Sequence, residues 1–185
     1  MSQAHRRATY EDLLAVPDGK IAQIVAGELH VHPRPASPHA RVTSTMGVDI
    51  GGPFDRGRGG PGGWVILDEP ELHLGGDILV PDLAGWRRER MPEMPETAFF
   101  TLPPDWVCEV LSPGTAKLDR GPKRRLYARE HVAHLWLVDP ETKTLEAFRI
   151  EGESYLLVAT HEDDAVARVP PFEAIELELA AWWSR

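Results

Sequence analysis

A strand, a basic helix and a second strand follow one another between residues 106 and 138, and this order limits the fold most. Residues 106–111 are apolar except for one position, residues 119–131 have a helical pattern, and residues 135–138 are again apolar. Two strands joined by a helix are typically parallel neighbours with a right-handed crossover. The flanking segments favour antiparallel hairpins. We therefore expect an α/β (α+β) chain with a mixed β-sheet flanked by helices.

Local patterns predict the remaining elements. A capped short helix begins at Thr9 and ends before Pro17. Residues 20–25 and 28–32 form an N-terminal hairpin around Gly27. Apolar residues recur every four positions in a helix over residues 38–50. Further strands are expected at residues 64–67, 72–74, 78–80, 144–150 and 155–160, and a short final helix or strand around residues 177–183.

A glycine-rich segment separates the first predicted helix from the strands that follow it. Residues 51–63 contain seven glycines and two prolines in thirteen positions, so we expect a flexible loop without helix or strand. The polar, proline-rich residues 87–104 are expected on the surface. A length of 185 residues with 42% hydrophobic residues fits one domain over 1–185, with its core at about residues 20–160.

The charge balance argues against a general attraction to nucleic acid. The chain has 20 Lys and Arg residues against 29 Asp and Glu residues, a net charge of −9, so any phosphate-binding surface must be a local patch. Its single cysteine, Cys108, cannot form an internal disulfide, and the first residues lack the apolar stretch of a signal peptide. No apolar run is long enough to cross a membrane. We therefore expect a cytoplasmic protein.

Glu109 interrupts the apolar run at residues 106–111, which otherwise has the pattern of a strand buried on both faces. A buried carboxylate without a partner costs several kcal/mol. A divalent cation is the simplest partner, because oxygen ligands suit Mg²⁺ or Mn²⁺. The alternative is that the strand has one solvated face and that Glu109 points to water.

Asp82 comes directly after Pro81, where the strand predicted at residues 78–80 ends. Ligands approach a sheet at the ends of its strands. Pro-Asp is also a common turn, so Asp82 alone indicates little. Together with Glu109 it gives two carboxylates on neighbouring strands, which can share one cation that polarises a phosphoryl oxygen.

Asp119, Lys123 and Tyr127 are spaced four residues apart, so they lie along one stripe of the predicted helix. Lys123 on that stripe can point at the same site and stabilise developing negative charge or orient a water. The alternative is an ordinary helical ion pair between Asp119 and Lys123.

The same helix is rich in basic residues. Residues 117–129 contain six Lys and Arg residues and one acid. A phosphate-binding rim is one interpretation and a solvated helix face is the other. The candidate nucleic-acid contacts are Arg120, Arg124 and Arg125 on the helix and Arg56 and Arg58 in the glycine-rich segment.

Three further residues or pairs have weaker signals. Glu28 follows Gly27 in the hairpin and His39 lies early in the helix at 38–50, so both are candidate outer members of the site. A hairpin-surface carboxylate and a helix cap are the alternatives. His30 and His32 share a strand face, but without a third ligand they are a poor zinc signature.

The chain resembles the putative restriction endonuclease family, a bacterial family of the PD-(D/E)XK nuclease superfamily. Four motifs carry this resemblance: VPDL at 80–83, WVCEVLSP at 106–113, DRGPKRRLYA at 119–128 and HLWLVDP at 134–140. YEDLL at 10–14 and GEL at 27–29 also look like the family's opening. The likeness spans roughly residues 9 to 180.

The resemblance implies a restriction-endonuclease-like core and divalent-metal-dependent hydrolysis of DNA. Asp82 matches the first acidic motif and Glu109 the second, and both would bind the metal. The lysine that commonly lies two residues after the second acid is replaced by Leu111. Lys123 matches a version in which this lysine has moved to the following helix, and Lys117 is the second choice.

The leading hypothesis is thus an endonuclease in which Asp82 and Glu109 ligate Mg²⁺ or Mn²⁺, Lys123 assists the attacking water and DNA is the partner. Asp119 and Tyr127 are accessory candidates beside it. The net charge and the displaced lysine leave open a second class, a nuclease-fold protein that binds nucleic acid or a protein without cutting. A smaller phosphodiester as substrate is a third option. Concerted cutting of two strands would favour a homodimer.

Overall fold

The structure is a computed structural model that describes residues 6–184, and its larger sheet has six strands. The order is β10 (Ser154–Glu162), β9 (Thr144–Glu151), β8 (His134–Asp139), β7 (Trp106–Val110), β6 (Leu83–Arg87) and β3 (Trp64–Asp68). The β7–β8 pair is parallel and the other four pairs are antiparallel. The mixed sheet expected from the sequence is therefore confirmed.

A smaller antiparallel sheet lies beside it, with the order β2 (Glu28–Pro33), β1 (Lys20–Val25), β5 (Asp77–Leu79) and β4 (Leu72–Leu74). The β1–β2 hairpin turns at Ala26 and Gly27, whose positive φ angles of 55° and 83° are typical of a two-residue hairpin turn. A register pair between Ile24 and Ile78 joins the hairpin to β5. The predicted N-terminal hairpin is thus present, in a sheet of its own.

The crossover from β7 to β8 is one helix made of three consecutive parts. These are α3 (Ala116–Leu118), a π-helical turn η2 (Asp119–Lys123) and α4 (Arg124–Arg129). The helix begins three residues before the predicted start, so Pro122 lies inside it and not in its first turn. Proline has no N–H to donate, and the π-helical turn is where the chain accommodates this loss.

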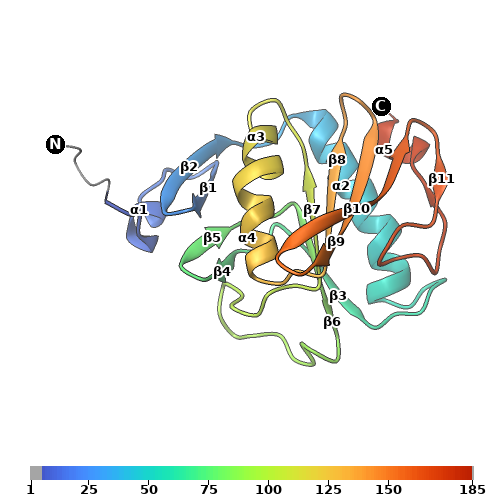
Figure 1. The fold of residues 1–185 in the computed structure, drawn as a ribbon, viewed down its shortest axis with the longest axis horizontal. Helices are drawn as coiled ribbons and strands as arrows, with labels where there is room; N and C mark the ends of the chain where they lie inside the picture. The colour runs from blue at the N-terminus through green and yellow to red at the C-terminus, as the bar shows by residue number, and fades with distance from the viewer. Residues whose placement is uncertain (1–5, 185) are drawn as a thin grey trace.

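Helices cover both faces of the large sheet. Alternate residues of β7 point to opposite faces. Trp106, Cys108 and Val110 belong to the core cluster that includes α2 (Ser37–Ile50), whereas Val107 belongs to the cluster that includes α4. Figure 1 shows α2 and the α3–α4 helix on opposite sides of β7. All five residues of β7 are buried, as the apolar run predicts.

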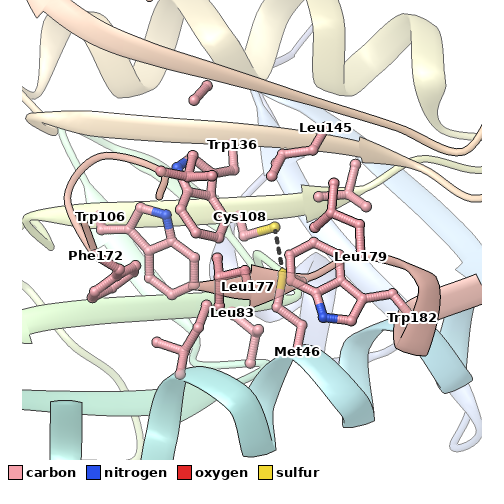
Figure 2. Packing of buried hydrophobic residues seen from close by; sticks show 14 of the residues in the cluster. Met46, Leu83, Trp106, Cys108, Trp136, Leu145, Phe172, Leu177, Leu179 and Trp182 are labelled. Carbon is pink, nitrogen blue, oxygen red and sulfur yellow. Dashed lines mark hydrogen bonds between the residues drawn. The ribbon is translucent and has the colours of Figure 1, made fainter. Parts of the chain in front are cut away.

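The core on the α2 face is aromatic (Figure 2). The rings of Trp106 and Trp136 meet edge to face at 5.2 Å, and Phe172 lies 4.9 Å from Trp106. Cys108 is fully buried, with its Sγ 3.7 Å from Sδ of Met46. Burial also raises the pKa of the Cys108 thiol well above its ordinary value, so this cysteine is a core residue and not a nucleophile.

Four short elements complete the ends of the chain. Helix α1 (Tyr10–Leu14) has the predicted capping box between Thr9 and Asp12. Strands β11 (Val166–Ala167) and β12 (Leu177–Glu178) pair with each other, and α5 (Ala180–Trp183) follows them. No helix within residues 6–184 is long and apolar enough to span a membrane.

Two sequence predictions need correction. Residues 51–55 are not loop, because a π-helical turn η1 (Gly51–Asp55) continues α2 and buries Phe54 against Phe172, with ring centroids 4.6 Å apart. Strand β6 was not predicted at all. Its central Gly85 is required by packing, since a Cβ there would lie 2.8 Å from Ile66 and 3.2 Å from Trp106.

Candidate metal and phosphodiester site

A cavity of about 280 Å³ opens where the β1–β2 hairpin meets the large sheet. One wall consists of β1, β2 and the start of α2. The other consists of the segments next to β6 and β7 and of the helix that follows β7. Its chemically active side chains are His32, His39, Asp82, Glu109, Asp119 and Lys123. The cavity therefore collects residues from five separate parts of the chain.

Glu109 lies at the bottom of the cavity and its side chain is 3% exposed. This burial excludes the interpretation that Glu109 points to water. Its Oε1 accepts a hydrogen bond from the Tyr127 hydroxyl at 2.5 Å and lies 2.7 Å from Nζ of Lys123. Burial raises the pKa of Glu109 to about 8, against the opposing effect of the Lys123 charge.

Lys123 is the buried cation of this cluster. Its ammonium contacts Oε1 of Glu109 at 2.7 Å and Oδ1 of Asp119 at 3.3 Å. Burial alone would lower the pKa of Lys123, but the two carboxylates outweigh it and raise the pKa above its ordinary value. One face of the helix thus carries Asp119, Lys123 and Tyr127, as their four-residue spacing predicts.

Asp82 lies immediately before β6, one residue beyond the register pair of Leu83 with Cys108. The strand that brings it to Glu109 is therefore the unpredicted β6, whereas the strand at 77–79 belongs to the smaller sheet. Its Oδ2 accepts the backbone N–H of Val110 at 2.7 Å, and its Oδ1 lies 3.2 Å from Nε2 of His39. Both carboxylate oxygens are thus held in place.

His39 comes from the first turn of α2, and its side chain is 11% exposed. Burial would lower the pKa of His39, but the neighbouring Asp82 carboxylate outweighs burial and raises it. Its Nδ1 is buried without a hydrogen-bond partner in the described part of the chain. His39 is therefore in direct contact with the cluster that its sequence position only suggested.

The donor set fits a hard divalent cation. Three carboxyl groups line the cavity, together with Lys123 and Arg34. No partner is found for Oε2 of Glu109 among residues 6–184. Mg²⁺ is usually held by one or two carboxylates, waters and substrate phosphate. No group of three or more His, Cys, Asp or Glu side chains within residues 6–184 is arranged to enclose a metal.

Several candidate residues lie elsewhere. Glu28 and Lys117 are exposed and do not line the cavity. The same holds for the exposed residues Arg56 and Arg58, which follow η1, and Arg125.

The other two helix arginines also have partners away from the cavity. Arg120 pairs with Glu146 on β9 at 2.5 Å. Arg124 stacks over the Phe148 ring at 5.7 Å. The basic helix therefore gives the cavity one cation, Lys123, and no arginine.

Among the lining residues with ionisable side chains, sequence reasoning did not assign His32 and Arg34. The pattern of alternating histidines at 30 and 32 placed His32 on a strand face, but it gave no indication that this face points at two carboxylates. Arg34 follows Pro33 at the end of β2, and nothing in its neighbourhood marks it. Both residues lie on the wall opposite β7.

Comparison with known proteins identifies a family and a solved structure that this chain is similar to. A model of the family described as putative restriction endonuclease (Uma2) matches residues 7–181. The crystal structure of a putative nuclease belonging to DUF820 from Anabaena variabilis is similar, with a TM-score of 0.74 and 21% sequence identity. The match covers 95% of this chain and 97% of that one. No curated protein matches the chain.

Proposed function

The chain belongs to the putative restriction endonuclease family, and from this premise we propose that it is a divalent-metal-dependent endonuclease that hydrolyses DNA phosphodiester bonds. The observation that carries the proposal is the joint position of Asp82 and Glu109 in one cavity, with Lys123 2.7 Å from Glu109. This combination of two carboxylates and a lysine is suited to phosphodiester chemistry. The nuclease-like fold supports the same reading.

Asp82 and Glu109 would hold the cation, Mg²⁺ or Mn²⁺. When bound, the cation supplies Lewis-acid polarisation of the phosphoryl oxygen and acidifies a bound water. Tyr127 and Lys123 both engage Oε1 of Glu109, so its Oε2 is the oxygen left for a ligand. The Val110 N–H and His39 each contact one oxygen of Asp82 and so fix its orientation.

Lys123 has two tasks in this proposal. It lowers the pKa of Glu109, against the larger effect of burial, by placing a positive charge 2.7 Å from the carboxylate. The same ammonium lines the cavity, where it would orient the attacking water and stabilise the charge that develops on the phosphate. Asp119 holds the ammonium from its other side at 3.3 Å.

A second candidate function is binding of nucleic acid or a protein without cleavage. The observation in its favour is that Arg120 contacts Glu146 and Arg124 contacts Phe148. The remaining basic surface of this acidic protein is therefore small. A cytoplasmic location, one domain over residues 1–185 and a homodimer remain predictions.

Incubation of supercoiled plasmid with the purified protein, in Mg²⁺, in Mn²⁺ and in EDTA, tests the function. We expect nicking with either metal, none in EDTA, and none by Asp82→Asn or Glu109→Gln with the metal present. Glu28→Gln is the matched control, because Glu28 is an exposed carboxylate outside the cavity. Cleavage by Glu109→Gln at the wild-type rate would reject the assignment, and metal binding without cleavage would favour the second candidate.

A further inference from the structure

The hairpin side of the cavity has no assigned role, although it carries two ionisable side chains, His32 on β2 and Arg34 directly after it. His32 lies on β2 in register with Ile21 of β1, and both residues line the cavity. His30 lies on the same face of β2, with its ring 6.4 Å from that of His32 and nearly parallel to it. The hairpin thus brings His32 to the cavity.

The Nε2 atom of His32 is buried and has no hydrogen-bond partner among residues 6–184. A buried polar atom without a partner costs about 1–3 kcal/mol, and most such atoms in native proteins are paired. The charges of Asp119 and Lys123 act on His32 but do not satisfy this atom, because Lys123 is bound to both Asp119 and Glu109. A ligand in the cavity is the group that can complete this hydrogen bond.

Arg34 is the unassigned cation of this wall. Its side chain is 66% exposed, and its ion pair with Glu69 is long, at 4.0 Å. It is therefore free to turn toward a ligand at the mouth of the cavity. The helix arginines cannot do so from their present contacts, since Arg120 pairs with Glu146 and Arg124 stacks on Phe148.

We propose that His32 and Arg34 form the phosphate-contacting wall of this site. His32 donates from Nε2 to a non-bridging oxygen of a DNA phosphodiester in the cavity, and Arg34 contacts the next phosphate at the mouth. The inference rests on the proposed function and assigns substrate contact to β2, opposite the carboxylates that would hold the cation. A phosphate between the two walls is then contacted from both sides.

The charge of His32 suits this position. Burial lowers the pKa of His32, and the nearby His30 and Lys123 lower it further against the opposing effect of Asp119. The imidazole is therefore neutral at pH 7. A neutral donor binds a phosphate oxygen without repelling a divalent cation in the same cavity.

The test separates substrate contact from metal binding and from folding. We would prepare His32→Leu, His32→Gln and Arg34→Ala. The glutamine retains an N–H donor of similar reach and leucine does not. Arg149→Ala is the matched control, because Arg149 is an exposed arginine outside the cavity. If His32→Leu is unstable, Arg34→Ala still tests the inference, because Arg34 is a surface residue whose replacement leaves the fold intact.

Binding is measured by fluorescence anisotropy of a labelled 12-nucleotide DNA in EDTA, which prevents cleavage, and Mn²⁺ affinity by calorimetry. We expect His32→Leu to weaken DNA binding about 5-fold to 10-fold, with recovery in His32→Gln. Arg34→Ala should weaken it about tenfold and reduce the slope of log affinity against log salt by about one. Mn²⁺ affinity should stay at the wild-type value in all of them.

Two results would overturn the inference. One is DNA binding by His32→Leu and Arg34→Ala equal to that of Arg149→Ala, or no binding by the wild type. The other is a loss of Mn²⁺ affinity in His32→Leu, which would make His32 a metal ligand. A wild type that binds DNA through these residues but cuts no plasmid would reject the proposed nuclease and leave the phosphate-contacting wall intact.

Discussion

The hydroxyl group of Tyr127 donates to Oε1 of Glu109 across 2.5 Å, and this is the same oxygen that Lys123 contacts. Two donors from successive turns of one helix therefore fix a single carboxylate oxygen. The orientation of Glu109 is set by the crossover helix and not by β7 alone. This arrangement makes the helix a structural part of the site.

Tyr127→Phe removes one of these donors and keeps the ring. We expect the affinity for Mn²⁺ to fall by about 10-fold to 100-fold, because groups that orient a ligand contribute this much in metal sites. Isothermal titration calorimetry measures the affinity. Tyr155→Phe is the control, since the Tyr155 hydroxyl donates to Val132 at 2.7 Å and does not line the cavity. Equal affinities in the two variants would contradict the prediction.

Lys123→Met leaves Glu109 and Asp119 buried without their cation. We expect a loss of about 3–5 kcal/mol in the free energy of unfolding, the usual cost of removing one partner of a buried ion pair. Urea unfolding measures it. Lys117→Met, at an exposed position of the same helix, should change stability by less than about 0.5 kcal/mol. Addition of 10 mM Mg²⁺ should raise the melting temperature of Lys123→Met more than that of the wild type.

The pH dependence of stability should include a contribution from His134. Burial lowers the pKa of His134, and its Nδ1 is buried without a partner in the described chain. Below about pH 6.5 the unfolded chain binds a proton at this residue and the folded chain does not, so stability falls as the pH falls. The melting temperature of His134→Gln should decrease less than that of the wild type between pH 7.5 and 5.5. Exposed His131→Gln should behave like the wild type.

Gly60 is the glycine of the 51–63 segment whose replacement should cost most. A Cβ at Gly60 would lie 2.4 Å from Cβ and 2.9 Å from the carbonyl oxygen of Pro53, in the π-helical turn. Gly60→Ala should lower the free energy of unfolding by about 1–3 kcal/mol, as overpacking does. Gly52→Ala has open space around its Cβ and serves as the control in the same thermal unfolding experiment. A stable Gly60→Ala would show that the segment is free to move away from Pro53.

The elements with strong periodic patterns were predictable. The buried strand at 106–110, the helix after it and the hairpin at 20–33 all lie where their residues indicate. Strand β6 escaped prediction because Gly85 interrupts its apolar run. Glycine is required at this position because Trp106 of β7 and Ile66 of β3 lie close to it. These contacts are distant in sequence, so a local pattern does not indicate them.

Part of the candidate site was also predictable from the sequence, and part was not. Glu109 and the stripe of Asp119, Lys123 and Tyr127 follow from burial and helical spacing, and the structure brings all four together. The position of the helix arginines away from the cavity could not be predicted in this way. The partner of Arg120 is Glu146, twenty-six residues farther along the chain. Long-range ion pairs of this kind have no signature in a single sequence.

The π-helical turn at Asp119–Lys123 limits which insertions and deletions this protein can tolerate during evolution. Each residue removed from a helix rotates everything after it by about 100° and shifts it by about 1.5 Å. A deletion at Gly121 would therefore turn Tyr127 away from Glu109 even if every remaining side chain were kept. Substitutions on the outer face of this helix are compatible with the site, whereas insertions and deletions within it are not. The number of residues between Asp119 and Tyr127 is thus as much a part of the site as their identities.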